Sequence, residues 1–255
     1  MFPLASAIVP ILIIRPRAGH AEHIGSGVHL RIAGKSIILT AAHVTDHRHN
    51  GSLCIPGAKG LTKFAGKIGF NLMQNGSARN QDRVDLGYLI PSNDDLATEF
   101  APLDLETLDL TNNAQERLFH LIAGFPLSRK WAKFRNGEHT GSRLYFVGIS
   151  FTDSECAAAG YEPSTNLLVE YHLDKAIYPE GDNANPPSPR GMSGGGVFQI
   201  GADLSGRPDS STARLVGIMH SFNERENIFV ATKLNIALRL LADSLPTAFS
   251  RHANY

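Results

Sequence analysis

Three side chains far apart in the sequence stand in settings that suit nucleophilic catalysis. His43 follows the run Ile37-Ile-Leu-Thr-Ala-Ala, in which bulky residues give way to two small ones that allow a sharp turn. Asp85 stands directly before the apolar stretch 86–90, where an unpaired carboxylate would be costly to bury. An imidazole N–H is a suitable partner, since the pair fixes the tautomer of the ring and stabilises its protonated form. With Ser193 added, the set predicts a nucleophile, a base and a residue that orients the base.

The serine lies in a glycine-rich loop that suits the stabilisation of a reaction intermediate. The loop reads Gly191-Met-Ser-Gly-Gly195 and continues with another glycine. Glycine at 191 lets the backbone curl, so that the amides of Gly191 and Ser193 point into one hole. Two such donors stabilise the oxyanion of a tetrahedral intermediate, and removing one typically costs ~3 kcal/mol. We therefore predict an oxyanion hole formed by Gly191 and Ser193.

Each of these residues taken alone has a structural explanation as well. A lone histidine at a strand end is often a core residue, an aspartate before a strand often faces solvent, and a glycine-rich loop often only turns the chain. Asp82 competes with Asp85, which we prefer because the apolar stretch begins directly after it. The prediction depends on the three pieces occurring together.

The elements that would position these residues are mostly strands. With 24 Gly and 14 Pro, the sequence consists of short apolar runs between turn residues. One helix is predicted over 232–244, where apolar residues recur at helical spacing from Leu234 to Leu241. The predicted strands are residues 8–14, 25–32, 36–40, 63–70, 84–90, 118–124, 144–149, 166–173, 196–200, 215–220 and 228–231.

This order of elements predicts an all-β fold, a barrel or a sandwich, with a C-terminal α-helix. Alternating βα units would have supplied several helices. Residues 91–113 are polar and acidic, which suggests an exposed connection between two halves. We therefore divide the chain into residues 1–113 with His43 and Asp85, residues 114–231 with Ser193, and the helix 232–246.

Charge and composition exclude some partners. Twenty-four basic and twenty-four acidic side chains cancel, and no run of like charge stands out. A nucleic-acid interface needs a basic face, and a polybasic anchor needs clustered Lys and Arg. We expect no nucleic acid, no membrane and no cofactor.

The cysteines and the N-terminal residues bear on the compartment. Cys54 and Cys156 are the only cysteines, fewer than secreted proteins of this size commonly use for disulfides. The apolar run 1–14 has no basic residue before it and contains two prolines, unlike a signal peptide. We expect a cytoplasmic protein; the alternative is export, with this run as the targeting segment.

Together the motifs resemble the trypsin/chymotrypsin-like serine proteases, in particular the bacterial-type members. The resemblance consists of Thr-Ala-Ala-His43, then Asp85 before an apolar strand, then Gly-x-Ser193-Gly-Gly. It extends over about residues 8–240, through Gly25-Ser-Gly-Val, Gly124-Phe-Pro and Leu215-Val-Gly-Ile. It implies two Greek-key antiparallel β-barrels that form one protease domain, and a serine endopeptidase that acts through an acyl-enzyme. Its partner would be a protein or peptide substrate.

Departures from the family concern activation and specificity. Met192 stands where family members activated by zymogen cleavage carry an acidic residue, so that activation by N-terminal clipping is not expected. Pro187 stands where trypsin carries the acid of its pocket, and Asp182 is farther away. The pocket would instead be lined by Pro187, His220, Ser221 and Phe222. His220 would bind an acidic or amide side chain, or else serve the barrel structurally, and Phe222 would narrow the mouth.

Regulation is expected to involve another protein. Residues 152–166 and 178–189 flank the expected cleft and are candidates for a lid or a regulatory contact. Without an export signal or zymogen switch, the chain fits an intracellular effector protease controlled by a partner.

Other functions remain as alternatives. Gly191-Met-Ser-Gly-Gly195 also fits the nucleophile elbow of α/β-hydrolases, but three glycines start a helix poorly. The spacing of His43, His47 and His49 suggests a metal site, but no further ligand pattern completes it, and we expect no metal. The remaining alternative is a catalytically silent protease-fold binding module or scaffold.

Overall fold

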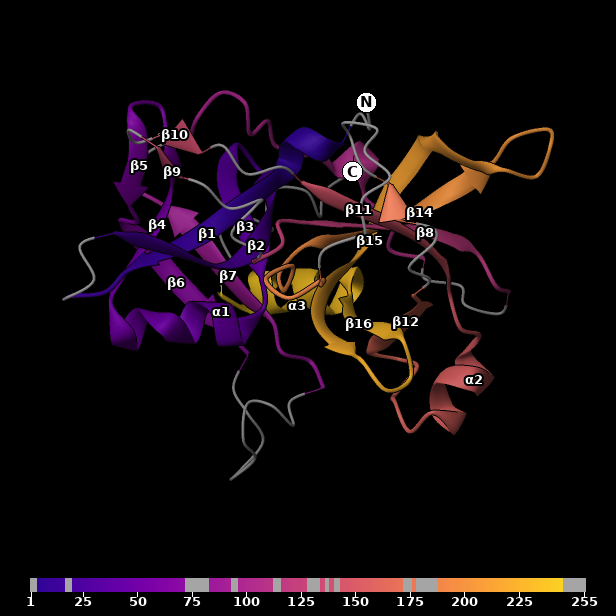
Figure 1. Cartoon of the computed structure of the whole chain (residues 1–255). Helices are drawn as coiled ribbons and strands as arrows, with labels where there is room; N and C mark the ends of the chain where they lie inside the picture. The colour runs from indigo at the N-terminus through magenta and orange to yellow at the C-terminus, as the bar shows by residue number, and fades with distance from the viewer. Residues whose placement is uncertain are drawn as a thin grey trace.

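The computed structural model describes residues 4–16, 20–71, 83–92, 96–111, 116–127, 134–135, 138–139, 143–171, 176–177 and 188–244. In this part of the chain the strands form two seven-stranded antiparallel sheets and a small hairpin, β9 (Phe134–Arg135) with β10 (Glu138–His139). The two sheets are curled and lie next to each other, the first built from the N-terminal half and the second from the C-terminal half (Figure 1).

The first sheet has the strand order β5-β4-β1-β2-β3-β7-β6. Its central strand pair, β1 and β2, runs antiparallel with Ile8 opposite Val28 and a bulge after Ile11. Its strands are β1 (Ile8–Ile14), β2 (Ala21–Ile32), β3 (Lys35–Thr40), β4 (Ser52–Gly57), β5 (Gly60–Lys63), β6 (Gly66–Phe70) and β7 (Gly87–Pro91).

The second sheet has the order β12-β16-β15-β14-β8-β11-β13. Strands β14 and β15 continue as a long hairpin that projects from the sheet (Figure 1). Its strands are β8 (Phe119–Gly124), β11 (Leu144–Ile149), β12 (Asn166–Glu170), β13 (Ala176–Ile177), β14 (Gly196–Ala202), β15 (Pro208–Asn223) and β16 (Ile228–Lys233).

The described helices are short, except for the last. They are α1 (Ala42–Asp46), α2 (Asp153–Ala158), α3 (Leu234–Ser244) and the 3-10 turns Ala5–Ala7, His47–Asn50 and Leu105–Thr107. None of the helices in the described ranges is long and apolar enough to cross a membrane.

The largest hydrophobic cluster joins the two sheets. It contains Val28 and Leu39 from the first sheet and Ala123 and Leu215 from the second, all almost fully buried. Helix α3 adds the apolar face predicted from its spacing, with Leu234, Ala237 and Leu241 fully buried. Burial of this surface holds the two sheets in fixed contact. Residues that project from the edges where the sheets meet are therefore held at set distances from one another.

The strand predictions are largely confirmed, and the deviations have local causes. Strands β1 and β11 have the predicted bounds. The predicted strand 63–70 is two strands, and the predicted strand 84–90 begins only at Gly87, because Asp85 has a φ of 24° that a strand does not accommodate. The predicted helix start at 232 is wrong, since residues 232 and 233 pair within the sheet. Strand β4 and helices α1 and α2 were not predicted. The division at 113 and 231 stays a prediction.

Candidate active site

The imidazole of His43 and the carboxylate of Asp85 are joined at two points. His43 lies in α1, and its Nδ1 is 2.5 Å from Oδ2 of Asp85, while its backbone N–H donates to Oδ1 at 2.9 Å. Both carboxylate oxygens are thus used by one residue. The aspartate side chain is 7% exposed and the histidine 36%, so that a buried carboxylate holds a partly exposed ring. With Nδ1–H donated to Asp85, Nε2 carries the lone pair that a general base needs.

The backbone around Asp85 is held in an unfavourable conformation. A φ of 24° is uncommon for a residue with a side chain, and such strain costs on the order of 1–3 kcal/mol. The carbonyl of Asp85 accepts from the N–H of Ala42 at 3.1 Å, and the next amide, Leu86 N–H, donates to Oδ1 of Asn71 at 2.9 Å. These contacts fix the direction in which the carboxylate leaves the chain. The competing residue, Asp82, lies outside the described residues.

The Ser193 loop is fixed by backbone hydrogen bonds to β15 and to the first sheet. The N–H of Gly194 donates to Met219 O at 2.7 Å, and Met219 N–H donates to Gly195 O at 2.8 Å. The carbonyl of Ser193 accepts from the N–H of Ser26, on β2, at 2.7 Å. The loop is therefore attached to both sheets. This is the position the nucleophile needs if it is to face a base carried by the first sheet.

Two glycines of this loop are required by its geometry. Gly191 has a φ of 90° and Gly194 a φ of 88°, in the region that favours glycine. A methyl group on Gly194 would overlap the carbonyl oxygen of Ser26, and one on Gly191 would lie 2.7 Å from the amide nitrogen of Leu127. The glycine spacing noted in the sequence thus reflects both backbone conformation and close approach.

Two amides in this loop have no acceptor within the described part of the chain. They are the N–H groups of Gly191 and Ser193, whereas those of Met192, Gly194 and Gly195 all donate to backbone carbonyls. An oxyanion hole requires two N–H groups that are not already bonded within the protein, and those of Gly191 and Ser193 would be such a pair. The described residues therefore provide no acceptor for the pair predicted from the sequence.

Ser26 is a supporting residue whose role the sequence did not predict. Its hydroxyl donates to Gly191 O at 3.2 Å and accepts from Phe125 N–H at 2.8 Å, while its carbonyl accepts from the hydroxyl of Thr40 at 2.7 Å. Ser26 therefore links the Ser193 loop to Phe125, just after the end of β8, and to β3. The flanking glycines of the Gly25-Ser-Gly segment were the only sequence signal.

Met192 anchors the same loop in the second sheet. Its side chain is fully buried in a cluster with Met219 and Phe229. A methyl group on Gly124 would come within 2.9 Å of its Cβ, so the contact with β8 is close. Apolar packing therefore fills the position at which trypsin-like proteases activated by zymogen cleavage carry an acidic residue.

Helix α1, which carries His43, and the Ser193 loop both lie close to Gly25 on β2. A methyl group on Gly25 would meet Val44, the residue after His43, at 2.5 Å and the Ser193 carbonyl at 3.1 Å. Helix α1 and the serine loop thus pack against the same point of β2. The hydroxyl of Ser193 donates to His220 O at 3.2 Å, and among the described atoms it forms no hydrogen bond with His43.

The residues predicted to line a specificity pocket differ in their surroundings. His220 is 6% exposed, and its carbonyl is the acceptor for Ser193. Ser221 is exposed, and Pro187 lies outside the described residues. The ring of Phe222 packs against Tyr171 at 4.9 Å between centroids. The assignment of these residues to a pocket stays a prediction.

Phe222 belongs to an aromatic cluster beside the serine loop. Phe229 lies opposite it on β16 at 5.2 Å between centroids, and Tyr171 and Phe146 complete the cluster. This cluster is continuous with the apolar one that buries Met192. Large aromatic rings therefore pack in the second sheet, in the cluster that contains Met192, the residue before Ser193.

In the sequence, His47 and His49 are possible metal ligands together with His43. His47 and His49 lie in the 3-10 turn after α1, and within the described ranges no three His, Cys, Asp or Glu side chains are grouped to hold a metal. Burial, together with nearby Arg15 and His43, lowers the pKa of His47. The lowered pKa favours the neutral form of His47.

Comparison with known proteins identifies the fold. No family model matches the sequence, and no curated protein matches it. Among solved structures, "Structure of GrC", which describes granzyme C, a trypsin-like serine protease, matches with a TM-score of 0.57 and 15% identity, covering 95% of each chain. At this identity the likeness shows the fold alone. It confirms the predicted fold class, two chymotrypsin-like β-barrels with a C-terminal helix.

Proposed function

We propose that this chain is a serine endopeptidase that hydrolyses peptide bonds through an acyl-enzyme. The observation that carries the proposal is the two-point contact between His43 and Asp85. Val44, next to His43, and the carbonyl of Ser193 both lie close to Gly25, which brings the pair and the serine loop to the same region. A buried carboxylate that orients a partly exposed imidazole beside a serine is the arrangement that activates a hydroxyl group.

In the proposed reaction His43 moves protons, and the amides hold charge. Nε2 of His43 takes the proton of Ser193 as Oγ bonds to the scissile carbonyl carbon. The negative charge passes to the carbonyl oxygen, which accepts from the N–H groups of Gly191 and Ser193. The imidazolium, stabilised by Asp85, then protonates the leaving amine as the C–N bond breaks. Water repeats the sequence on the acyl-enzyme and releases the acid.

The resting hydroxyl must turn before it reacts. It donates to His220 O, and proton transfer requires that it donate to His43 instead. A change of the Ser193 rotamer is a small motion, and hydrogen bonds of catalytic groups are often formed only when substrate is present. Substrate binding along the exposed Ser221 side of β15 would supply that change.

The hydrogen bond from the Ser193 hydroxyl to His220 O favours a second candidate function, a catalytically silent binding module of this fold. In that case the bond between Ser193 and His220 would be the permanent state. The two functions differ in one respect that is open to measurement, since only the endopeptidase cleaves a substrate.

The packing of Met192 bears on how the chain would be activated. Because its side chain is buried among apolar residues, no N-terminal ammonium group could pair with it after clipping. Control by a partner protein in the cytoplasm, as for an effector protease, fits such a chain. Its substrate would be a protein or peptide.

Cleavage of a diverse peptide library by the purified chain, with and without cell lysate, tests the proposal. We expect cleavage by the wild type and none by Ser193→Ala, which removes one oxygen atom and leaves the loop bonds of the backbone in place. If both proteins leave the library intact under both conditions while remaining folded, the enzyme proposal is wrong and the binding module stands.

A further inference from the structure

Two buried side chains of the second sheet hold the segment that leads into Asp85. Nδ2 of Asn166 donates to the carbonyl of Arg83 at 2.5 Å, and the hydroxyl of Thr232 donates to the carbonyl of Val84. Asn166 is 1% exposed and Thr232 is fully buried. Two side chains of the second sheet thus donate hydrogen bonds to two consecutive backbone carbonyls, those of Arg83 and Val84.

The two donors form one structural unit. Asn166 on β12 and Thr232 on β16 are direct partners in the antiparallel ladder, and paired residues present their side chains next to each other on one face. Their spacing lets them meet the carbonyls of two successive residues, Arg83 and Val84. A pair of polar residues at such buried positions is costly unless both are bonded, and here the bonds lead to residues 83 and 84.

The residue that follows these two carbonyls is the strained one. Asp85 has a φ of 24°, and such a conformation persists only where the surroundings over-determine it. The carbonyl of Asp85 is held by Ala42 from the first sheet side, while the carbonyls of Arg83 and Val84 are held from the second. The direction of the carboxylate is therefore set by both sheets.

We propose that Asn166 and Thr232 are positioning residues that aim the Asp85 carboxylate at His43, so that the orientation of the base depends on the second sheet. The inference rests on the proposed function for its consequence in catalysis. Neither residue touches His43 or Ser193 through any contact described here; each acts through the backbone of residues 83 and 84.

The loop that contains α2 also contacts the segment before Asp85. The guanidinium of Arg83 donates to the carbonyl of Gly160, just after α2, and lies 5.7 Å from the ring of Tyr161. The region around α2 thus contacts the same segment that Asn166 and Thr232 hold. Movement of this loop would be transmitted to the backbone before Asp85.

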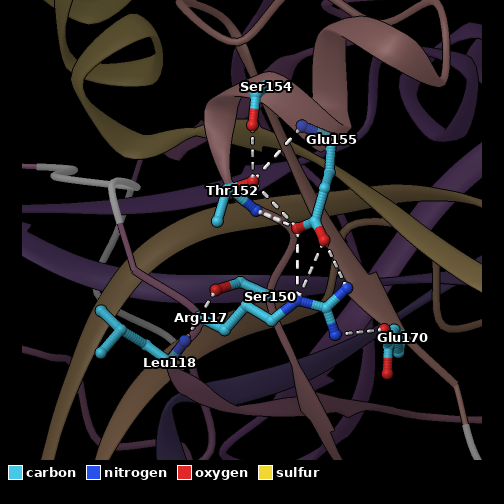
Figure 2. A network of polar contacts seen from close by, with 7 residues as sticks. All are labelled: Arg117, Leu118, Ser150, Thr152, Ser154, Glu155 and Glu170. Atoms are coloured by element: carbon cyan, nitrogen blue, oxygen red, sulfur yellow. Dashed lines mark hydrogen bonds and ion pairs between the residues drawn. The ribbon is translucent and has the colours of Figure 1, made fainter.

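Helix α2 is itself firmly attached to the second sheet. Figure 2 shows Arg117 between two carboxylates, with bonds to Glu155 at 2.6 Å and to Glu170 at 2.8 Å. Glu155 also forms a capping box with Thr152 at the start of the helix. The Arg117 guanidinium and the Thr152 amide lower the pKa of Glu155 to about 2, so this carboxylate stays charged at neutral pH. The start of α2 is therefore connected through Arg117 to Glu170 on β12.

The test compares Thr232→Val, which removes the hydroxyl and keeps the shape, with Thr232→Ser, which keeps a hydroxyl. Thr165→Val is the control: its hydroxyl is less buried than that of Thr232, but it also donates to a loop carbonyl, that of Glu162 at 3.2 Å, and not to residue 83 or 84. Thr232→Val should lower kcat about 10- to 100-fold with little change in KM, as expected for a small misplacement of a catalytic group. Thr232→Ser should restore most of the activity, and Thr165→Val should match the wild type.

A second readout does not depend on activity. The proton between Nδ1 of His43 and Asp85 should give a far-downfield NMR resonance, which Thr232→Val should weaken or shift while Thr232→Ser and Thr165→Val preserve it. An inactive wild type in which Thr232→Val alters the resonance would refute the protease and support the positioning role. A folded Thr232→Val with the resonance and kcat of the wild type would overturn the inference.

If Thr232→Val does not fold, Arg83→Ala provides the test. Arg83 is exposed, so that the change should be tolerated, and its guanidinium holds the same segment to Gly160. We expect a several-fold lower kcat and a broadened resonance. An unchanged resonance in Arg83→Ala, together with unchanged kcat, would mean that the direction of the Asp85 carboxylate does not depend on how the backbone at residue 83 is held, and would overturn the inference.

Discussion

Ser26 on the first sheet donates its hydroxyl proton to the carbonyl of Gly191 in the nucleophile loop of the second, at 3.2 Å. The same hydroxyl accepts from the N–H of Phe125 at 2.8 Å. One small side chain thus joins three segments at the point where the two sheets meet. This contact holds the peptide between Gly191 and Met192, which directly follows the Gly191 N–H expected to form half of the oxyanion hole.

Replacement of Ser26 by alanine should reduce both kcat and the stability of the fold. The N–H of Phe125 would lose its buried acceptor, at a cost of about 1–3 kcal/mol. We expect kcat to fall at least about tenfold, since loss of one oxyanion donor costs 10²–10³ and this change only loosens it, on the order of a tenth of that effect. Steady-state kinetics and urea denaturation measure the two effects.

Ser150→Ala is the control for that experiment. Ser150 is also buried, and its hydroxyl accepts from the N–H of Leu118 at 3.1 Å, within the second sheet. It should lose similar stability and keep its kcat. Equal losses of kcat in both variants would mean that Ser26 only stabilises the fold.

Met192 should not accept a carboxylate. Met192→Asp would bury an unpaired charge beside Met219 and Phe229, at a cost of several kcal/mol, whereas Met192→Leu should cost less than about 1.5 kcal/mol. Urea denaturation of both variants measures the difference. An aspartate variant as stable as the leucine variant would show that a cation reaches this position.

His120 should make the protein less stable as pH falls. Burial in β8 lowers its pKa to about 4, although the Leu118 carbonyl opposes the shift. Below pH ~6.5 the unfolded chain binds a proton that the folded chain does not, so stability decreases from there down to about pH 4. At about 1.4 kcal/mol per pH unit, this residue contributes a loss of about 3 kcal/mol.

His120→Gln should remove that part of the pH dependence. The free energy of unfolding of the variant, measured between pH 7 and 4, should fall less steeply than that of the wild type. Parallel curves for the two proteins would show that His120 does not titrate with a lowered pKa.

Local patterns predicted much of the fold. The run Ile8–Ile14 is apolar and bounded by turn residues, and its strand has the predicted bounds. Helix α2 was missed, although Thr152 and Glu155 carry the spacing of the capping box that the structure contains. The helix start was misplaced because Thr232 has a ladder partner in Asn166, a tertiary contact that helical spacing does not report.

The candidate catalytic residues could be predicted because the local sequence determines their setting. The residues that hold them in place could not be predicted. Glycines around Ser193 are visible in the sequence because the backbone there needs positive φ. The donors that hold the backbone before Asp85 lie 83 and 148 residues away from their acceptors. No local pattern connects such positions, and only the packing of one sheet on the other brings them together.

Covalent labelling of Ser193 tests the central proposal most directly. The wild type, treated with a fluorophosphonate and digested for mass spectrometry, should carry one adduct, on Ser193. The adduct should be absent from Ser193→Ala and strongly reduced in Asp85→Asn, in which the imidazole would adopt the wrong tautomer. A folded wild type without an adduct on Ser193, alone and in lysate, would contradict the assignment of this chain as a serine endopeptidase.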